Sequence, residues 1–213
     1  MAVENGTNGD DEFYMSTMGP VVFPETAHGY NALGGNDIVY GSSWVDIIEG
    51  GTGDDVLYGY GGDDALIGQQ GNDTMFGGAG DDFIHGGSQD AGEDILDGGA
   101  GNDTLSGGPG NDIYLHTANG GVDIINDGDS EATVPGYGGG EDFIQFTAIS
   151  WDQLAFYRPP NSGDLWLASL DDFADGFMDD GVIVQDFFQA DPNTFIEWVY
   201  TSDGFWVDLA QLL

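Results

Sequence analysis

The chain has 213 residues, of which 39 are Asp or Glu and only one, Arg158, is Lys or Arg, so its formal net charge at pH 7 is -38. A chain this acidic repels itself, so it must either stay unfolded or bind cations. The charge also argues against nucleic acid and anionic membrane surfaces as partners, because both need Lys and Arg to neutralise phosphate. Since the chain has no cysteine, no disulfide can hold the fold.

The sequence shows neither a signal peptide nor a membrane span. Its first part lacks a basic stretch followed by an apolar one, which is the pattern of a signal peptide. No apolar run reaches the roughly 18 residues that a membrane-spanning helix needs. We therefore expect no membrane span and no export by the signal-peptide route.

The composition changes near residue 140. Glycine is concentrated before this point, and the sequence after it is much richer in aromatic residues. We expect three regions: an N-terminal lead-in that caps a solenoid at 1–31, the repeats of the solenoid at 32–126, and a C-terminal capping domain at 127–213.

A nine-residue repeat fills the middle region, with copies such as GGTGDDVLY at 50–58 and GGPGNDIYL at 107–115. Glycine recurs at positions one, two and four, and an apolar residue at position eight. Three extra residues between Gly87 and Gly92 are expected to form an external loop. Fainter copies place Asp11 before the region and Asp142 after it. Position six holds Asp37, Asp46, Asp55, Asp64, Asp73, Asp82, Asp94, Asp103, Asp112 and Asp123.

The repeat predicts an all-β solenoid. Glycines allow a tight six-residue turn, and the last three residues of each unit are expected to be extended with position eight pointing inward. Three residues are too few for a free strand, so units must stack, two in each coil. Equivalent positions then lie 18 residues apart, in two parallel sheets with a row of Asp along each edge.

Successive carboxylates in such a row lie about one strand spacing apart, roughly 4.7 to 4.9 Å, and repel each other unless a cation lies between them. Calcium suits this gap because it takes about six to eight oxygen ligands in tolerant geometry, whereas magnesium demands a near-ideal octahedron and zinc prefers His or Cys. The alternative, a solvated acidic face, would not keep phase with glycine and an inward apolar residue. We assign the Asp and Asn residues at position five to the conformation of the turn rather than to metal binding.

The pattern GGxGxDxUx resembles the RTX (repeats-in-toxin), or haemolysin-type calcium-binding, family over about residues 32–145. The resemblance implies a right-handed parallel β-roll with up to about eight calcium ions. Each ion would lie between turn n and turn n+2, held by the two position-six Asp side chains and by carbonyl groups of the turn. Trp44 and Val45 depart from the motif, as does the insertion at 88–91. The implied glycine ligands are Gly50, Gly53, Gly59, Gly62, Gly68, Gly71, Gly77, Gly80, Gly98, Gly101, Gly107 and Gly110.

After residue 140, apolar stretches alternate with turn signals, which predicts a small antiparallel β cap over the end of the solenoid. The stretches are DFIQFTAI, QLAFYR, DLWLASL, GVIVQDFF, TFIEWVY and GFWVDLAQLL. Four segments also resemble the domain that follows the repeats in haemolysin-type proteins: DFIQF, QLAFYR, DLWLASL and DGFW. In that family the end of the chain carries an uncleaved type I secretion signal, which would lie between about residue 150 and Leu213. The alternative is a cap without a targeting role.

No catalytic apparatus is expected. The three histidines lack metal-ligand spacing, and no nucleophile elbow, P-loop or dinucleotide fingerprint occurs. The resemblance implies a secreted, extracellular calcium-binding module. It would fold on binding calcium and support type I secretion of a larger protein such as a toxin, adhesin or exoenzyme. The alternative is a calcium-dependent module that binds a polysaccharide or a cell surface.

Overall fold

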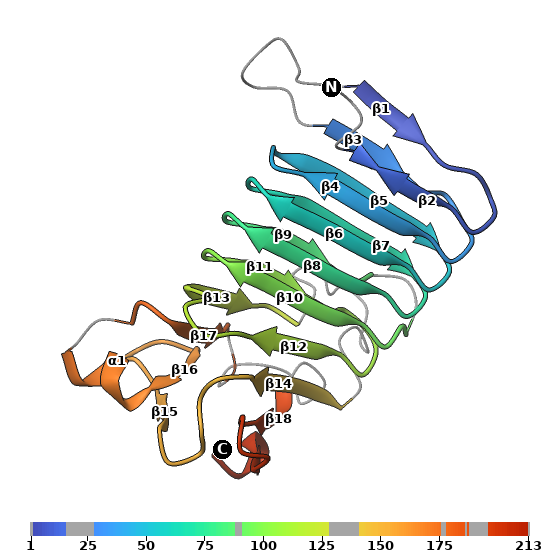
Figure 1. The fold of residues 1–213 in the computed structure, drawn as a ribbon. Coiled ribbons are helices and arrows are strands. Elements are labelled where there is room, and N and C mark those ends of the chain that lie inside the picture. Colours follow the sequence, from blue (N-terminus) through green and yellow to red (C-terminus); the bar gives the residue numbers. More distant parts are fainter. Residues whose placement is uncertain are drawn as a thin grey trace.

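A computed structural model of the protein contains two sheets that run along its length. In each sheet the strands are stacked from the N-terminal end toward the C-terminal end (Figure 1). The structure describes residues 2–15, 28–87, 91–127, 141–175, 178–185, 187 and 196–212. The ten-stranded sheet has the order β1 (Ala2–Asn5), β3 (His28–Asn31), β5 (Asp46–Thr52), β7 (Ala65–Gln70), β9 (Phe83–His85), β11 (Thr104–Ser106), β13 (Val122–Ile125), β17 (Gly181–Val184), β16 (Leu165–Ser169) and β15 (Leu154–Tyr157). The nine-stranded sheet has the order β19 (Trp206–Asp208), β18 (Ile196–Tyr200), β14 (Asp142–Phe146), β12 (Ile113–His116), β10 (Ile95–Ala100), β8 (Thr74–Ala79), β6 (Val56–Gly61), β4 (Ile38–Ser42) and β2 (Glu12–Tyr14).

Successive strands of the repeat region alternate between the two sheets, so each sheet pairs residues one coil apart. Leu57 pairs with Val39 on one side and with Met75 on the other, and all pairing within the repeats is parallel. The predicted parallel β-roll with two units in each coil is therefore confirmed. The same ladders extend to β1, β2 and β3, before residue 32.

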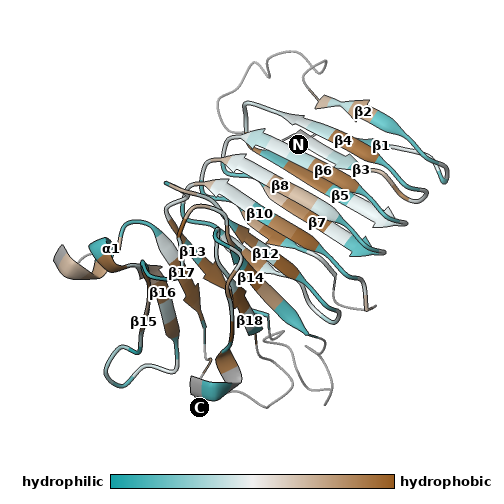
Figure 2. Ribbon diagram, turned by 60° about the horizontal axis from the view of Figure 1, so that its bottom comes forward, coloured by the Kyte–Doolittle hydropathy of each residue, from teal (hydrophilic) through white to brown (hydrophobic). Residues whose placement is uncertain are grey.

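The core consists of two rows of side chains between the sheets, one row from each sheet. Every position-eight residue from Val39 to Tyr114 is at most 1% exposed, as the inward direction of that position predicts. Figure 2 shows the corresponding hydrophobic stripe across the strands of the stack. One apolar residue from each unit thus closes the interior, and the turns are left to hold the coils together.

Most strands of the roll are longer than the three residues expected, although β9 and β11 have that length. β6 and β8 pair not only at Leu57 and Met75 but also at Tyr60 and Gly78, which belong to the next unit's turn. The first residues of the turn therefore continue the ladder, because adjacent coils follow the same path and their backbones stay in register. For these longer strands, the predicted length of three residues was too short for this reason.

Beyond the repeats, the strand pairing changes from parallel to antiparallel. β17 and β18 still pair in parallel with β13 and β14, whereas β16, β15 and β19 add in antiparallel fashion. All six apolar stretches predicted after residue 140 contain a strand. These strands lie at the end of the stack opposite the N-terminus (Figure 1).

The segment between the apolar stretches DLWLASL and GVIVQDFF was expected to be a turn, but a helix begins there, α1 (Leu170–Asp175). The hydroxyl of Ser169 accepts a hydrogen bond from the amide of Asp172 at 3.2 Å and so caps the N-terminus of the helix. This cap was not recognised in the sequence. A short 3-10 helix, η2 (Leu209–Leu212), follows β19. Among the described residues, no helix has the length and apolar character needed to cross a membrane.

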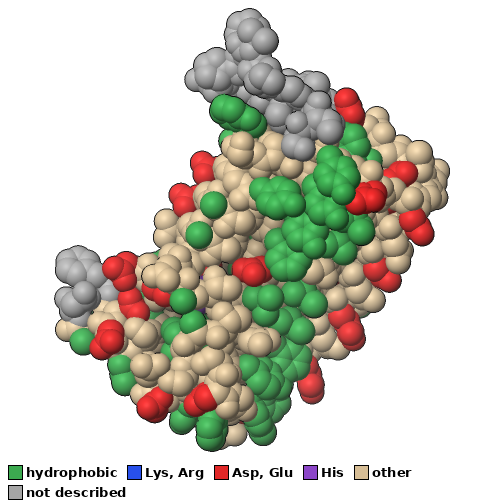
Figure 3. Space-filling view, viewed as in Figure 1, with side chains coloured by type: hydrophobic (Ala, Val, Ile, Leu, Met, Phe, Trp, Pro, Cys, Tyr) green, Lys and Arg blue, Asp and Glu red, His purple; other side chains and the backbone are tan. Residues whose placement is uncertain are grey.

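Aromatic side chains stack across the outer face of the nine-stranded sheet. The rings of Tyr14, Tyr40, Tyr58 and Phe76 lie 4.4, 5.3 and 5.1 Å apart in succession, with interplanar angles of 3 to 12°. Figure 3 shows hydrophobic side chains gathered in a band along the roll and acidic side chains stepping down one turn edge. We call the four rings the aromatic ladder.

Candidate metal sites

The position-six Asp residues form two buried ladders, one at each turn edge of the roll. In the first, which we call the Asp37 ladder, the backbone amide of each Asp donates to Oδ1 of the next at 2.6 to 2.8 Å. In the second, the Asp46 ladder, the corresponding distances are 2.7 to 3.2 Å. The Asp37 ladder comprises Asp11, Asp37, Asp55, Asp73, Asp94, Asp112 and Asp142; the Asp46 ladder comprises Asp46, Asp64, Asp82, Asp103 and Asp123.

The structure brings together every Asp pair that the sequence predicts, and it buries them. All ten predicted position-six Asp residues are between 0 and 3% exposed. Except at Asp46, the first member of its ladder, Oδ1 of each accepts the amide hydrogen bond of the preceding Asp. The other oxygen, Oδ2, is buried and accepts no hydrogen bond from the described residues at Asp37, Asp55, Asp64, Asp82 and Asp103.

Burial without a counter-charge has a strong effect on the pKa of these carboxyl groups. Desolvation raises the pKa of Asp55 to about 7 and that of Asp64 to about 8, and the neighbouring carboxylates of each ladder add to the effect. Desolvation likewise raises the pKa of Asp82 to about 6 and that of Asp103 to about 8. The amide hydrogen bonds act in the opposite direction but do not compensate. An ionised ladder therefore needs a cation.

The position-one glycines make room for these carboxylates. A Cβ on Gly50, Gly59 or Gly68 would collide with Oδ2 of the Asp five residues later. The same holds for Gly77, Gly98 and Gly107. Glycine at this position thus keeps a backbone turn directly beside Oδ2 of the ladder Asp.

The position-four glycines solve a different problem. Their φ angles lie between 108 and 151°, a region that L side chains rarely adopt. A Cβ on Gly71 would also collide with the carbonyl oxygen of Gly53 in the preceding coil. Position four therefore lets the turns of adjacent coils approach closely. The predicted members of this set are Gly53, Gly62, Gly71, Gly80, Gly101 and Gly110.

The position-five residues form exposed hydrogen-bond ladders in which the direction of donation between coils is reversed. The amide of Asp54 donates to Oδ1 of Asn36 in the preceding coil, and the amide of Asn72 donates to Asp54 in the same way. In the buried ladders the donor instead belongs to the earlier coil. Position five thus ties adjacent turns together from the solvent side, in agreement with its predicted conformational role.

The described residues on either side of the insertion keep their positions in the repeat. Residues 88–90 of the expected external loop lie outside the described residues. On either side of them, Gly86 lies beside the Asp94 carboxylate and Gly92 faces the carbonyl of Gly71, so they fill positions one and four. Leu96 pairs with Met75, and the amide of Asp73 donates to Asp94, so the phase is kept as predicted.

At each end of the Asp46 ladder, one carboxylate oxygen has a hydrogen-bond partner from outside the ladder. At the first turn, where Trp44 and Val45 depart from the motif, Oδ2 of Asp46 accepts hydrogen bonds from the amide and hydroxyl of Ser42 at 2.6 and 3.0 Å. At the last turn, Nδ1 of His116 lies 2.8 Å from Oδ2 of Asp123. These two ends differ from the turns between them.

The Asp37 ladder extends further than the ten predicted ligands. Asp142 accepts the amide hydrogen bond of Asp112, and the amide of Asp142 donates to Oε2 of Glu197 at 2.8 Å. Asp142 is visible in the sequence because GGGEDFIQF repeats the motif, although it lies 30 residues after Asp112. Glu197 carries no repeat signal, and only the pairing of β14 with β18 brings it there.

The oxygen atoms at the ladders are ligands that suit calcium. The buried side-chain oxygens that accept no hydrogen bond are carboxylate oxygens, and the turns also contain carbonyl oxygens. Calcium takes about six to eight such hard ligands, whereas zinc would need His or Cys. His116 lies at the last turn of the Asp46 ladder, and two Asp side chains already hold it.

Comparison with known proteins agrees with this chemistry. A family model described as "RTX calcium-binding nonapeptide repeat (4 copies)" matches residues 45–75, 58–91 and 90–114. No curated protein matches the chain. Among solved structures, extracellular lipase LipA from Serratia marcescens is similar over 77% of this chain and 39% of the lipase, at 17% identity and a TM-score of 0.27. The chain thus spans well under half of that lipase. Residues 45–114 belong to the family of RTX calcium-binding nonapeptide repeats.

Proposed function

We propose that this chain is a calcium-dependent folding module of a secreted protein, exported by a type I system, and that it has no catalytic role itself. One observation carries the proposal. The two Asp ladders bury carboxylate oxygens that accept no hydrogen bond from the described residues, in a chain whose only Lys or Arg is Arg158. The protein lacks the charge to neutralise its own interior.

The mechanism follows from this deficit. Without cations, ladder carboxylates in adjacent coils repel one another and their burial opposes ionisation, so the unfolded chain is favoured at neutral pH. Bound calcium supplies positive charge between the coils. Each Asp pair then holds its two coils together, and ion binding and folding become one equilibrium.

This equilibrium would suit export. In a cytosol with little free calcium the chain would remain unfolded and fit a narrow channel, and in millimolar extracellular calcium it would fold. The resemblance of the segments after residue 140 to haemolysin-type proteins supports a secretion signal within about 150–213. The partners would be calcium and the type I secretion machinery, and the cargo would be a larger protein that contains this chain.

The direct test is a far-UV circular dichroism titration of the full chain. With excess EGTA at neutral pH we expect a largely disordered spectrum, and with millimolar calcium a β spectrum. Magnesium at the same concentration serves as the control for ionic strength and should not restore the spectrum. A folded roll in EGTA would contradict the proposed mechanism.

A second candidate function, a calcium-dependent glycan-binding module, is favoured by a cleft in the C-terminal region. The cleft has a volume of about 560 Å³ and is lined by aromatic side chains that include Tyr157, Trp166 and Phe173. A concave site lined mainly by apolar and aromatic side chains is typical of a ligand site. The aromatic ladder is a poorer platform, because its rings cover one another's faces.

A glycan array in calcium tests this second function. Binding that is lost in Trp166→Ala, which removes a ring that lines the cleft, would support it. Tyr58→Ala in the aromatic ladder is the matched control and should leave binding unchanged. An array with no calcium-dependent signal would reject the glycan-binding function and leave the folding module unaffected.

A further inference from the structure

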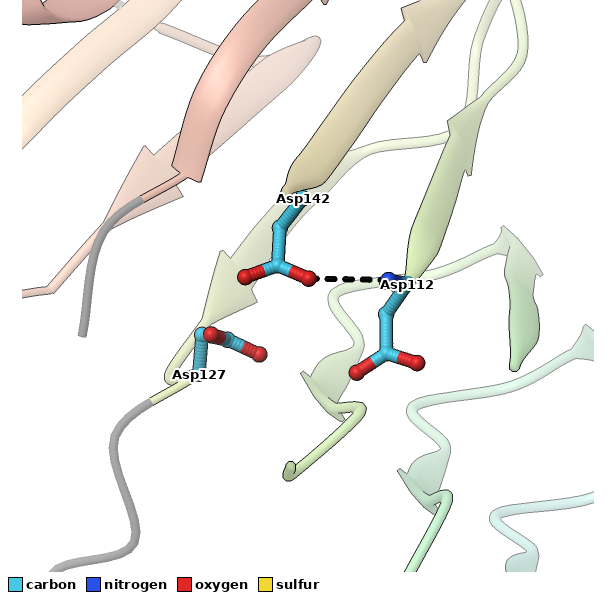
Figure 4. A group of neighbouring side chains, drawn as sticks. All are labelled: Asp112, Asp127 and Asp142. Carbon is cyan, nitrogen blue, oxygen red and sulfur yellow. Dashed lines mark hydrogen bonds between the residues drawn. The ribbon is translucent and has the colours of Figure 1, made fainter. Parts of the chain in front are cut away.

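The C-terminal end of the Asp37 ladder differs from every earlier turn because a third carboxylate enters it. Asp112, Asp127 and Asp142 each place one carboxylate oxygen within 4.8 Å of the others, and all three residues are buried. Figure 4 shows the carboxylate of Asp127 directed into the space between the other two. Asp112 and Asp142 are ladder residues, whereas Asp127 is not at position six.

Asp127 stands where earlier coils have glycine. The pairing of Leu105 with Ile125 places Asp127 opposite Gly107, a position-one glycine. At Gly107 the absent side chain makes room for the Asp112 carboxylate. One coil later, the side chain at this position is itself a carboxylate, so the turn gains a negative charge at the place where the repeat keeps open space.

The Asp127 side chain is held in position but not satisfied. Its Oδ1 accepts a hydrogen bond of 2.5 Å from the hydroxyl of Tyr114, which in turn accepts one of 2.7 Å from the amide of Gly107. Its Oδ2 is buried and accepts no hydrogen bond from any described residue. Asp127 is only 3% exposed, so water does not solvate this oxygen freely.

Among the described residues, the cationic side chains lie away from the cluster. Arg158 follows β15, which is separated from β13 by β17 and β16 in the ten-stranded sheet. His116 is occupied by Asp123 and Asp180. Three buried carboxylates at this spacing would repel each other strongly without an ion among them.

We propose that Asp112, Asp127 and Asp142 form a terminal calcium site that is distinct from the two-Asp sites between repeat turns. Asp112 immediately precedes β12, and Asp142 is the first residue of β14; both strands belong to the nine-stranded sheet. Asp127 follows β13 in the ten-stranded sheet. One ion would therefore join the two sheets at the coil onto which β17 and β18 pair. The inference rests on calcium binding by the roll, and its test separates the two.

The test counts calcium ions per chain by native mass spectrometry at saturating calcium. Asp127→Asn keeps the shape of the side chain and an acceptor for Tyr114 but removes the charge. The control is Glu141→Gln, which removes one charge from an exposed side chain next to Asp142. We expect Asp127→Asn to bind one ion fewer than both the wild type and Glu141→Gln.

A second variant keeps the proposal falsifiable if Asp127→Asn does not fold. Tyr114→Phe removes only the hydroxyl that holds Asp127. In a calcium titration we expect the affinity for one of the calcium ions to fall roughly tenfold, because Asp127 loses one hydrogen bond to its charged group. Equal ion counts in Asp127→Asn and Glu141→Gln would overturn the terminal site alone, as would a Tyr114→Phe titration identical to that of the wild type. A wild-type chain that takes up no calcium would overturn both proposals.

Discussion

Nδ1 of His116 lies 2.8 Å from Oδ2 of Asp123, at the last turn of the Asp46 ladder. The pairing of Asp97 with Leu115 places His116 opposite Gly98, a position-one glycine. His116 and Asp127 therefore occupy equivalent places at the ends of the two ladders. One ladder ends on a side chain that can carry a positive charge, and the other ends on an additional carboxylate.

The His116 pair predicts a large effect of mutation. Burial lowers the pKa of His116, but hydrogen bonding and charge from Asp123, together with Asp180, outweigh it and raise the pKa above its usual value. His116→Ala would leave Asp123 buried without this partner, which costs about 3 to 5 kcal/mol for a buried ion pair. Urea denaturation in excess calcium measures the loss.

His85→Ala is the control for His116→Ala. His85 lies in β9, and its ring contacts only the carbonyl oxygen of Ser106, at 3.2 Å, among the hydrogen bonds of the described residues. Its loss should cost no more than about 1 kcal/mol, the usual net value of one hydrogen bond. Equal losses in the two variants would show that Asp123 does not depend on the imidazole.

The repeat region could be predicted because its residues act locally and periodically. Asp at position six, glycine at positions one and four, and an apolar residue at position eight specify each coil and its neighbour, so a period of nine encodes the sheets and both ladders. The ends of the ladders could not be predicted in this way. His116 contacts Asp180, 64 residues away, and Glu197 reaches Asp142 only through β18. Such contacts depend on how the C-terminal strands pack and leave no periodic signal.

Without calcium, we expect the roll to be more stable at pH 5 than at pH 8. The folded-state pKa values of Asp55, Asp64 and Asp103, about 7 to 8, exceed the value of about 3.9 expected in an unfolded chain. A group with a raised folded-state pKa stabilises the fold fully below its unfolded pKa, and this contribution is lost as pH rises through the folded value. Most of the loss should therefore occur between pH 4 and 8.

Circular dichroism in calcium-depleted buffer across this pH range checks the prediction. The β signal should increase as the pH falls. In calcium the trend should reverse, because protons and calcium compete for the same carboxylates. A calcium-free chain whose signal is independent of pH would contradict the assignment of buried, uncompensated carboxyl groups to the ladders.

Substitution of Gly71 separates close coil packing from backbone strain. Gly71 has a φ of 123°, and a Cβ there would meet the backbone of Gly53. Gly204 also has a positive φ, 83°, but a Cβ there would meet nothing within 4 Å. Gly204→Ala should cost about 1 to 2 kcal/mol for the left-handed backbone, whereas Gly71→Ala should cost about 4 kcal/mol or more. Thermal denaturation of both variants in calcium would measure the difference, and similar losses would mean that the coils can move apart.

Asp64→Asn should change stability in opposite directions with and without calcium. Asp64 is 3% exposed, and its Oδ2 accepts no hydrogen bond from the described residues. In calcium-depleted buffer at pH 8 the amide removes a buried charge, so the variant should be more stable than the wild type. In calcium it lacks a ligand shared by two predicted Asp pairs, Asp46/Asp64 and Asp64/Asp82, and should lose about 1 to 3 kcal/mol.

The neighbouring substitution Asp63→Asn makes the same change of charge at an exposed position-five residue. Its side-chain oxygen can still accept the amide hydrogen bond of Asp81, as Oδ1 of Asp63 does at 3.0 Å. Because Asp63 lies on the solvent side of the turn, its substitution should have little effect in either condition. Denaturation midpoints of the two variants, measured with and without calcium, therefore distinguish a buried ligand from general acidity. If Asp64→Asn destabilised the protein in both conditions, the ladder oxygens would not carry the repulsion that calcium is proposed to relieve.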